Sequence, residues 1–291
     1  MPGKAEAKHG EGLLRIGDAV PRFEDARLLS GQGRYTDDIR LDRQTYLAIV
    51  RSPHPRARIV SIDAAAAAAA PGVLHVITGR DLAQLGTFSS RIRRSAASGE
   101  PMFEPLRRVL PLEEVRYVGE AVAAVVAERP EQARDAAELV QVAYEPLPAA
   151  ASIEAAVAAN APAVWPEVPD NIAFVYSAGD ANAVDDAFAR AKHAVSLTCR
   201  INRVTASPIE PRTALADCDR ASGRLTLYAS VQTPHALRNE LCTRIFRIPA
   251  SSLRVMAPDV GGAFGMKSGD YVEYALLLWC ARVVRRPVRW T

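Results

Sequence analysis

The chain has 291 residues, of which 49% are hydrophobic and 24% charged, and its formal net charge is +3. This composition supplies a core for about two domains, and its weak basicity argues against a nucleic-acid partner. No apolar run approaches the roughly 18 residues of a membrane-spanning helix. Residues 1–22 are predicted to be a disordered arm, and they lack the apolar stretch of a signal peptide. We therefore expect a cytoplasmic protein without a membrane span.

The first part of the chain, residues 23–148, alternates strands and helices in the manner of an α/β unit. Asp63 is placed to cap the alanine helix that follows it, and Pro130 is typical of the first turn of a helix. Residues 121–127 are apolar throughout, which indicates a strand buried on both faces. The predicted strands are 46–51, 58–62, 73–78, 121–127 and 140–144.

Residues 149–170 are rich in alanine and proline and are predicted to be a linker. A second domain is predicted over residues 171–291. Its expected elements are a helix over 180–192, strands over 193–204, 214–217 and 225–231, a helix carrying Leu237, Leu241 and Ile245, and a helix over 270–284. The last helix is apolar nearly all round, so with the sequence stopping at Thr291 we expect an exposed apolar patch there.

The four cysteines are scattered, and none is at Cys-x-x-Cys spacing. This argues against an iron–sulfur cluster or a zinc site within the chain. Their mostly apolar neighbours predict buried thiols in a reducing compartment. They are Cys199, Cys218, Cys242 and Cys280.

A glycine-rich turn stands between a short apolar strand near Val255 and the last helix. Glycines let main-chain N–H groups approach an anion closely, and a helix start adds partial positive charge. The turn therefore predicts a cradle for an anionic group. A phosphate loop is a competing interpretation, but it requires glycine where this chain has Met266. A plain tight turn before a buried helix is the other alternative.

Five separated motifs occur in one order along the chain. They are 27–39 (RLLSGQGRYTDDI), 116–123 (RYVGEAVA), 207–212 (SPIEPR), Gln232 after a strand, and 261–265 (GGAFG). Together they resemble the large subunit of the molybdenum hydroxylases, the family of xanthine dehydrogenase, aldehyde oxidase and aerobic carbon monoxide dehydrogenase. The resemblance covers residue 27 to the last residue. It implies an α/β hammerhead domain over 23–148 and the first part of an α+β molybdopterin-binding domain over 171–291.

The resemblance also implies a cofactor site. Gln232 resembles the glutamine whose amide hydrogen-bonds an oxo ligand of molybdenum, and Phe264 resembles the phenylalanine beside the metal. The loop that would hold the molybdopterin comprises Gly261, Gly262, Ala263, Phe264 and Gly265, with no direct metal ligand. Taken alone, the glutamine could equally be a strand-end amide that satisfies a turn, and the phenylalanine a core aromatic.

Three residues of this loop region depart from the family pattern. Met266 stands where the family usually has a small residue. Ala263 replaces the usual third glycine, and its methyl group would be strained at a positive φ. Ser268 stands where xanthine-type enzymes carry a substrate-facing glutamate, which argues against purine-like substrates.

The activity implied by the resemblance is oxidation of an aldehyde, an N-heterocycle or carbon monoxide, with water as the oxygen source. The implied cofactor is molybdenum–molybdopterin in its cytosine dinucleotide form, and the implied partners are an iron–sulfur subunit and an FAD subunit. The family's general-base glutamate is expected beyond Thr291, and a C-terminal half or a second copy of the large subunit is a further implied partner. We therefore expect no turnover from this chain alone. The alternative is a catalytically inactive fragment or assembly module that binds partner subunits without metal.

Overall fold

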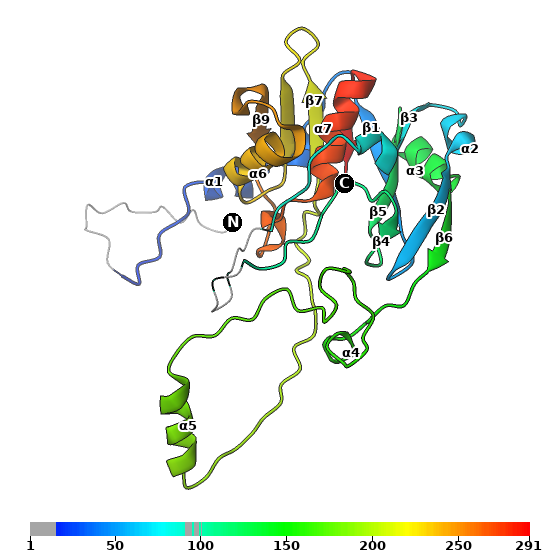
Figure 1. Cartoon of the computed structure of the whole chain (residues 1–291). Coiled ribbons are helices and arrows are strands. Elements are labelled where there is room, and N and C mark those ends of the chain that lie inside the picture. Colours follow the sequence, from blue (N-terminus) through cyan, green and yellow to red (C-terminus); the bar gives the residue numbers. More distant parts are fainter. Residues whose placement is uncertain (1–15, 91–94, 96–98, 100) are drawn as a thin grey trace, which may run out of the picture. The chain divides into compact units, whose positions relative to one another are not determined.

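The computed structural model describes residues 16–90, 95, 99 and 101–291 (Figure 1). The chain divides into two units, residues 1–34 and 35–291. In the first unit, helix α1 (Asp25–Leu29) begins beside an ion pair of 2.9 Å between Arg22 and Asp25. Residues 1–15 of the predicted disordered arm lie outside the described residues.

The second unit is built on a seven-stranded mixed sheet in the order β3-β5-β1-β10-β7-β8-β9. Strand β10 runs parallel to β1, β9 runs parallel to β8, and the other neighbours are antiparallel. The strands are β1 (Thr45–Arg51), β3 (Val73–Thr78), β5 (Ala121–Ala127), β7 (Ala214–Cys218), β8 (Leu225–Ala229), β9 (Leu253–Met256) and β10 (Val288–Trp290). Every residue of β5 is buried, as its unbroken run of alanine and valine predicted.

A second sheet of three strands has the order β4-β2-β6, with bounds β2 (Ala57–Asp63), β4 (Glu114–Val115) and β6 (Gln141–Pro146). The predicted capping residue Asp63 accepts the N–H of Ala65 at 2.9 Å, at the start of α2 (Ala65–Ala68). Pro130 is the first residue of α3 (Pro130–Glu138), as predicted. The remaining helices are α4 (Ile153–Ala156), α5 (Ala181–Arg190), α6 (Pro234–Glu240), which continues as a π-helix over Leu241–Phe246, and α7 (Val272–Val284).

Helix α7 is part of the core and lies against β7, β8 and β10. Its residues from Glu273 to Ala281 are buried, and the stacked rings of Trp279 and His75 join it to β3. The expected exposed apolar patch on this helix is therefore wrong, because the large sheet already covers it. The predicted inward residues Leu237, Leu241 and Ile245 are buried in the same core.

The strand predicted over residues 193–204 is not formed. Its apolar residues Val195, Leu197, Ile201 and Val204 are 84–92% exposed. A strand at this position would be expected to pair with the next two strands along the chain, β7 and β8. Both edges of β7 are occupied, by β10 and β8, and both edges of β8 are occupied, by β7 and β9. The segment thus has no free edge to join at β7 or β8.

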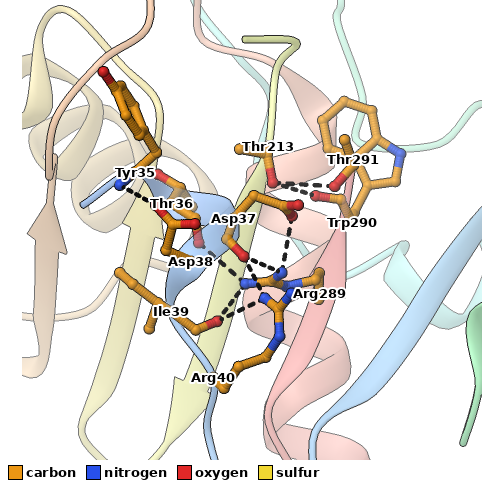
Figure 2. Close-up of polar contacts among 10 residues, drawn as sticks. All are labelled: Tyr35, Thr36, Asp37, Asp38, Ile39, Arg40, Thr213, Arg289, Trp290 and Thr291. Carbon is orange, nitrogen blue, oxygen red and sulfur yellow. Dashed lines mark hydrogen bonds and ion pairs between the residues drawn. The ribbon is translucent and has the colours of Figure 1, made fainter. Parts of the chain in front are cut away.

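The buried Arg289 of β10 fastens the turn of residues 36–38 to the centre of the sheet (Figure 2). Its guanidinium donates to the carbonyl oxygens of Thr36 and Asp37, both at 3.0 Å, to the Asp37 carboxylate at 2.8 Å, and to the carbonyl of Ile39. The adjoining Tyr35 forms a β-bridge with Asp259 in the glycine-rich turn. Part of the early 27–39 motif is therefore tied to the region of the candidate site.

One sheet contains strands from both predicted domains, since β1, β3 and β5 precede the predicted linker and β7 to β10 follow it. The division into domains at 23–148, 149–170 and 171–291 stays a prediction. Among the described residues, no helix is both long and apolar enough to cross a membrane.

The four cysteines are free thiols with different surroundings. Cys242 and Cys280 are buried, as predicted, and burial raises the pKa of both thiols. Cys218 is half-buried. The prediction is wrong for Cys199, which is exposed because it belongs to the unpaired segment 193–204.

Candidate functional site: a glycine-rich loop beside Gln232

The glycine-rich loop follows β9 and ends in a short 3-10 helix, Met266–Ser268. Gly262 and Gly265 have φ angles of +92° and +86°, which glycine adopts without strain. Ala263 is buried and is not among the residues with positive φ, so the strain expected there does not arise. The loop instead places Phe264 at φ +49°. The methyl group at position 263 is therefore compatible with the conformation of the loop.

Four consecutive backbone donors of this loop point to a binding function. The N–H groups of Gly262, Ala263, Phe264 and Gly265 donate to no acceptor within the part of the chain that the structure describes. Successive N–H groups in loops of alternating φ sign form concave anion sites. Helix α7 begins only at Val272, so the loop itself, and not the helix end, supplies the local positive charge. These donors fit an anionic or oxygen-rich cofactor.

Phe264 is held out of the core beside these donors. Its side chain is 81% exposed, so the interpretation as a core aromatic is wrong. A non-glycine residue at positive φ costs roughly 1–3 kcal/mol, and such residues concentrate at functional sites. An exposed aromatic ring on a strained backbone is typical of a surface that a ligand covers.

Gln232 lies against the far end of the same loop. Its backbone N–H donates to the carbonyl of Lys267 at 3.1 Å, and its side-chain Oε1 accepts the hydroxyl of Ser268 at 2.9 Å. With Oε1 held in this way, the side-chain N–H₂ remains a donor with no partner among the described residues. The structure therefore brings Gln232 and the loop together, which the resemblance requires. Their role in holding a cofactor stays a prediction.

Glu210 is a residue of this site that the sequence reasoning did not assign. Its Oε2 accepts the Ser230 hydroxyl at 2.5 Å, the Gly261 N–H at 2.8 Å and the Lys267 ammonium at 2.8 Å. The side chain of Lys267 is 0% exposed and that of Glu210 is 10% exposed. The only sequence signal was its position in the proline-flanked 207–212 motif.

The described residues contain no group of three or more histidine, cysteine, aspartate or glutamate side chains that could hold a metal ion. His235, in the first turn of α6, is exposed. Apart from the Glu210–Lys267 ion pair, the candidate site is made of backbone donors, one amide and one aromatic ring. Such a set binds an organic group through hydrogen bonds and does not coordinate a metal directly.

Comparisons with known proteins identify the family of this chain. Residues 30–148 match the family model described as "Aldehyde oxidase and xanthine dehydrogenase, a/b hammerhead domain", and residues 164–291 match the "Molybdopterin cofactor-binding domain". The chain belongs to the molybdenum hydroxylase family and corresponds to the N-terminal, molybdopterin-binding portion of its large subunit. The predicted α/β hammerhead followed by part of a molybdopterin-binding domain is confirmed.

Among its relatives, the nicotine 6-hydroxylase large subunit of Paenarthrobacter nicotinovorans is 38% identical over 94% of this chain and 33% of that subunit. The carbon monoxide dehydrogenase large chain of Afipia carboxidovorans is 34% identical over 98% of this chain and 35% of its own length. The crystal structure of quinoline 2-oxidoreductase from Pseudomonas putida 86 superposes with a TM-score of 0.82 at 38% identity, over 94% of this chain and 34% of that one. The chain spans about a third of the length of these relatives.

Proposed function

We propose that this chain forms the molybdopterin-binding part of an oxidoreductase that oxidises an aldehyde, an N-heterocycle or carbon monoxide, with water as the oxygen source. The observation that carries the proposal is the set of four unpartnered N–H donors at Gly262–Gly265 beside the amide of Gln232. Relatives with 34–38% identity bear the names of a nicotine hydroxylase and a carbon monoxide dehydrogenase. Those names support the reaction class without selecting one substrate.

Each residue of the site has a role that its chemistry allows. The N–H groups of the loop bind acceptor oxygens or nitrogens of the molybdopterin. The amide N–H₂ of Gln232 donates toward the metal end of the cofactor without changing its own charge. The ring of Phe264 excludes water from the same surface. When bound, the cofactor supplies a redox-active metal that takes up electrons from the substrate.

The finer parts of the proposal concern the cofactor's form and its neighbours. We infer an iron–sulfur subunit and an FAD subunit, because electrons must leave the molybdenum and the described residues hold no group of metal-binding side chains. We infer the cytosine dinucleotide form from the family resemblance alone. We also infer a C-terminal half or a second copy of the large subunit as a partner. A cytoplasmic location is consistent with four cysteines in the free thiol state.

A matched pair of glycine substitutions tests the proposal. Gly265 in the loop has φ +86° and Gly223 in the turn between β7 and β8 has φ +71°, and a Cβ at either position meets no atom within 4 Å. Gly265→Ala and Gly223→Ala therefore carry similar backbone strain, but only the first disturbs the proposed site. The chain is produced together with its genomic neighbours in cells that make molybdopterin, and molybdenum per chain is measured by mass spectrometry.

We expect about one molybdenum per chain in the unmodified complex and in Gly223→Ala. We expect a loss of about tenfold or more in Gly265→Ala, because the alanine displaces the donors of the loop. The pterin released by denaturation should fall in parallel. Equal molybdenum in both variants would refute the assignment of the loop. Absence of molybdenum from the unmodified complex would instead favour an assembly module without metal.

A further inference from the structure

The Glu210 carboxylate makes contacts at both ends of the glycine-rich loop. Gly261 stands at the start of the loop and donates its N–H to Oε2, and Lys267 stands after the loop and donates its ammonium to the same oxygen. The second carboxylate oxygen, Oε1, is buried and has no hydrogen-bond partner among the described residues. All three donors to the carboxylate thus converge on one oxygen atom, which fixes their mutual positions.

Close packing reinforces this arrangement at the start of the loop. The N–H of Glu210 donates to the carbonyl of Gly261 at 3.3 Å, so the two residues are joined by a backbone bond as well as a side-chain bond. A Cβ on residue 261 would lie 2.6 Å from the Cβ of Glu210, a separation that real Cβ atoms essentially never show. Only glycine fits there while Glu210 keeps its position.

The ion pair between Glu210 and Lys267 is also connected to Gln232 by hydrogen bonds. The backbone N–H of Gln232 donates to the carbonyl oxygen of Lys267 at 3.1 Å. The hydroxyl of the neighbouring Ser268 donates to the side-chain Oε1 of Gln232 at 2.9 Å. Ser230, two residues before Gln232, donates to Glu210 directly at 2.5 Å. One buried carboxylate therefore joins the end of β8, the start of the loop and the residue that holds Gln232.

We propose that Glu210 is a positioning residue, which acts through Lys267 and Gly261 to set the spacing between Gln232 and the backbone donors of the loop. The inference rests on the proposed function, because those two groups are the proposed walls of the molybdopterin site. Glu210 itself is assigned no contact with the cofactor. Its charge holds Lys267 in a position where an ammonium would otherwise be buried and unpaired.

The test separates positioning from simple neutralisation of a buried charge. Glu210→Gln leaves the Lys267 ammonium buried without a counter-ion, so it should lower stability and cofactor content together. The double variant Glu210→Gln with Lys267→Met removes both charges at similar volume, which often leaves stability near its original value. Glu145→Gln is the control, because its ion pair with Arg58 lies at the surface with both side chains more than half exposed.

Three quantities are measured for each variant in the assembled complex: the urea midpoint, molybdenum per chain, and hydrogen exchange of a peptide that covers residues 257–268. In the double variant we expect the urea midpoint to recover most of the loss. We also expect exchange of the loop amides to remain about tenfold or more faster than in the unmodified chain, and molybdenum to remain about tenfold or more lower, because the far end of the loop has lost its charged anchor. The control should match the unmodified chain in all three.

If the double variant recovered stability, loop protection and molybdenum together, Glu210 would serve only to neutralise Lys267 and the inference would be overturned. Unchanged loop exchange in Glu210→Gln would overturn it as well. Failure of the proposed function gives a different result, namely no molybdenum in the unmodified complex. In that case the exchange measurement still decides whether Glu210 orders the loop.

Discussion

Arg289 offers the sharpest test of how the fold holds the start of its second unit. Its buried guanidinium is the donor for the carbonyl groups of Thr36 and Ile39 and for two oxygens of Asp37. In Arg289→Met the aliphatic stem remains, but these acceptors lose a charged donor. The Thr36 carbonyl keeps the N–H of Ile39 at 3.3 Å, and the Ile39 carbonyl keeps the Arg40 guanidinium at 3.2 Å. A hydrogen bond from a charged donor contributes about 1.5–2 kcal/mol where its acceptor keeps a second partner, so the bonds to Thr36 and Ile39 together contribute about 3–4 kcal/mol.

The contact with Asp37 adds less, since its carboxylate is 58% exposed and a screened pair of this kind is worth about 1 kcal/mol at most. We therefore expect Arg289→Met to lower the free energy of unfolding by about 3–5 kcal/mol in total. For a chain of this size the corresponding fall in Tm is roughly 6–20 °C. The free energy of unfolding of Arg289→Lys should lie between those of the unmodified chain and of Arg289→Met, because a single ammonium cannot reach all four acceptors.

Urea unfolding followed by circular dichroism measures the effect. The control is Arg129→Met, which removes a surface ion pair of 3.4 Å with Glu131 and should cost less than about 1 kcal/mol. If Arg289→Met lay within about 1 kcal/mol of this control, water would be satisfying the carbonyls of the turn. The assignment of Arg289 as a structural clamp would then be refuted.

Three further predictions concern single groups. Ser268→Ala removes the hydroxyl that holds the side chain of Gln232, which is then free to rotate. Because a neutral hydrogen bond contributes about 1 kcal/mol, cofactor retention, measured as molybdenum content after dilution, should fall about fivefold. Ser268→Thr keeps a hydroxyl and should retain most of the cofactor. Burial raises the pKa of the Glu120 carboxyl, so its stabilising contribution is present in full at low pH and is lost as the pH rises through the raised pKa. Glu120→Gln should therefore gain in Tm relative to the unmodified chain between pH 4 and pH 7, and a constant difference would contradict this. An aromatic disulfide reagent should label Cys199 at once and Cys280 only after denaturation, because the first thiol is exposed and burial raises the pKa of the second.

Strands that have a clear local pattern could be predicted from the sequence. The uniform apolar run of β5 and the proline at the start of α3 each predicted an observed element. The prediction of a strand over 193–204 was wrong. Alternation of apolar and polar residues indicates which side chains would share a face, but it does not show whether a neighbouring strand has a free edge for pairing. The three residues of β10 carry too little pattern to be recognised. Their position follows from long-range pairing with β1 and β7.

The candidate site was predictable where its chemistry is local. Glycine spacing indicated the loop, and the strand end indicated Gln232. Glu210 was not assigned, because its donors at Gly261 and Lys267 are 51 and 57 residues away along the chain. The strain expected at Ala263 was wrong because single-residue preferences do not fix which neighbour takes the positive φ, and here Phe264 takes it.

The place of β10 in the sheet has a consequence for biosynthesis. Within the described sheet, the strand group β3-β5-β1 and the group β7-β8-β9 are joined through residues 288–290 of β10. On a translating ribosome, the facing edges of β1 and β7 stay open for roughly 4–14 s after β7 has been made, at ordinary rates of chain elongation. Unpaired strand edges of this kind can form hydrogen bonds with strands of other chains, which leads to aggregation. The nascent chain should therefore depend on a chaperone that shields these two edges until the last of the seven strands emerges from the exit tunnel.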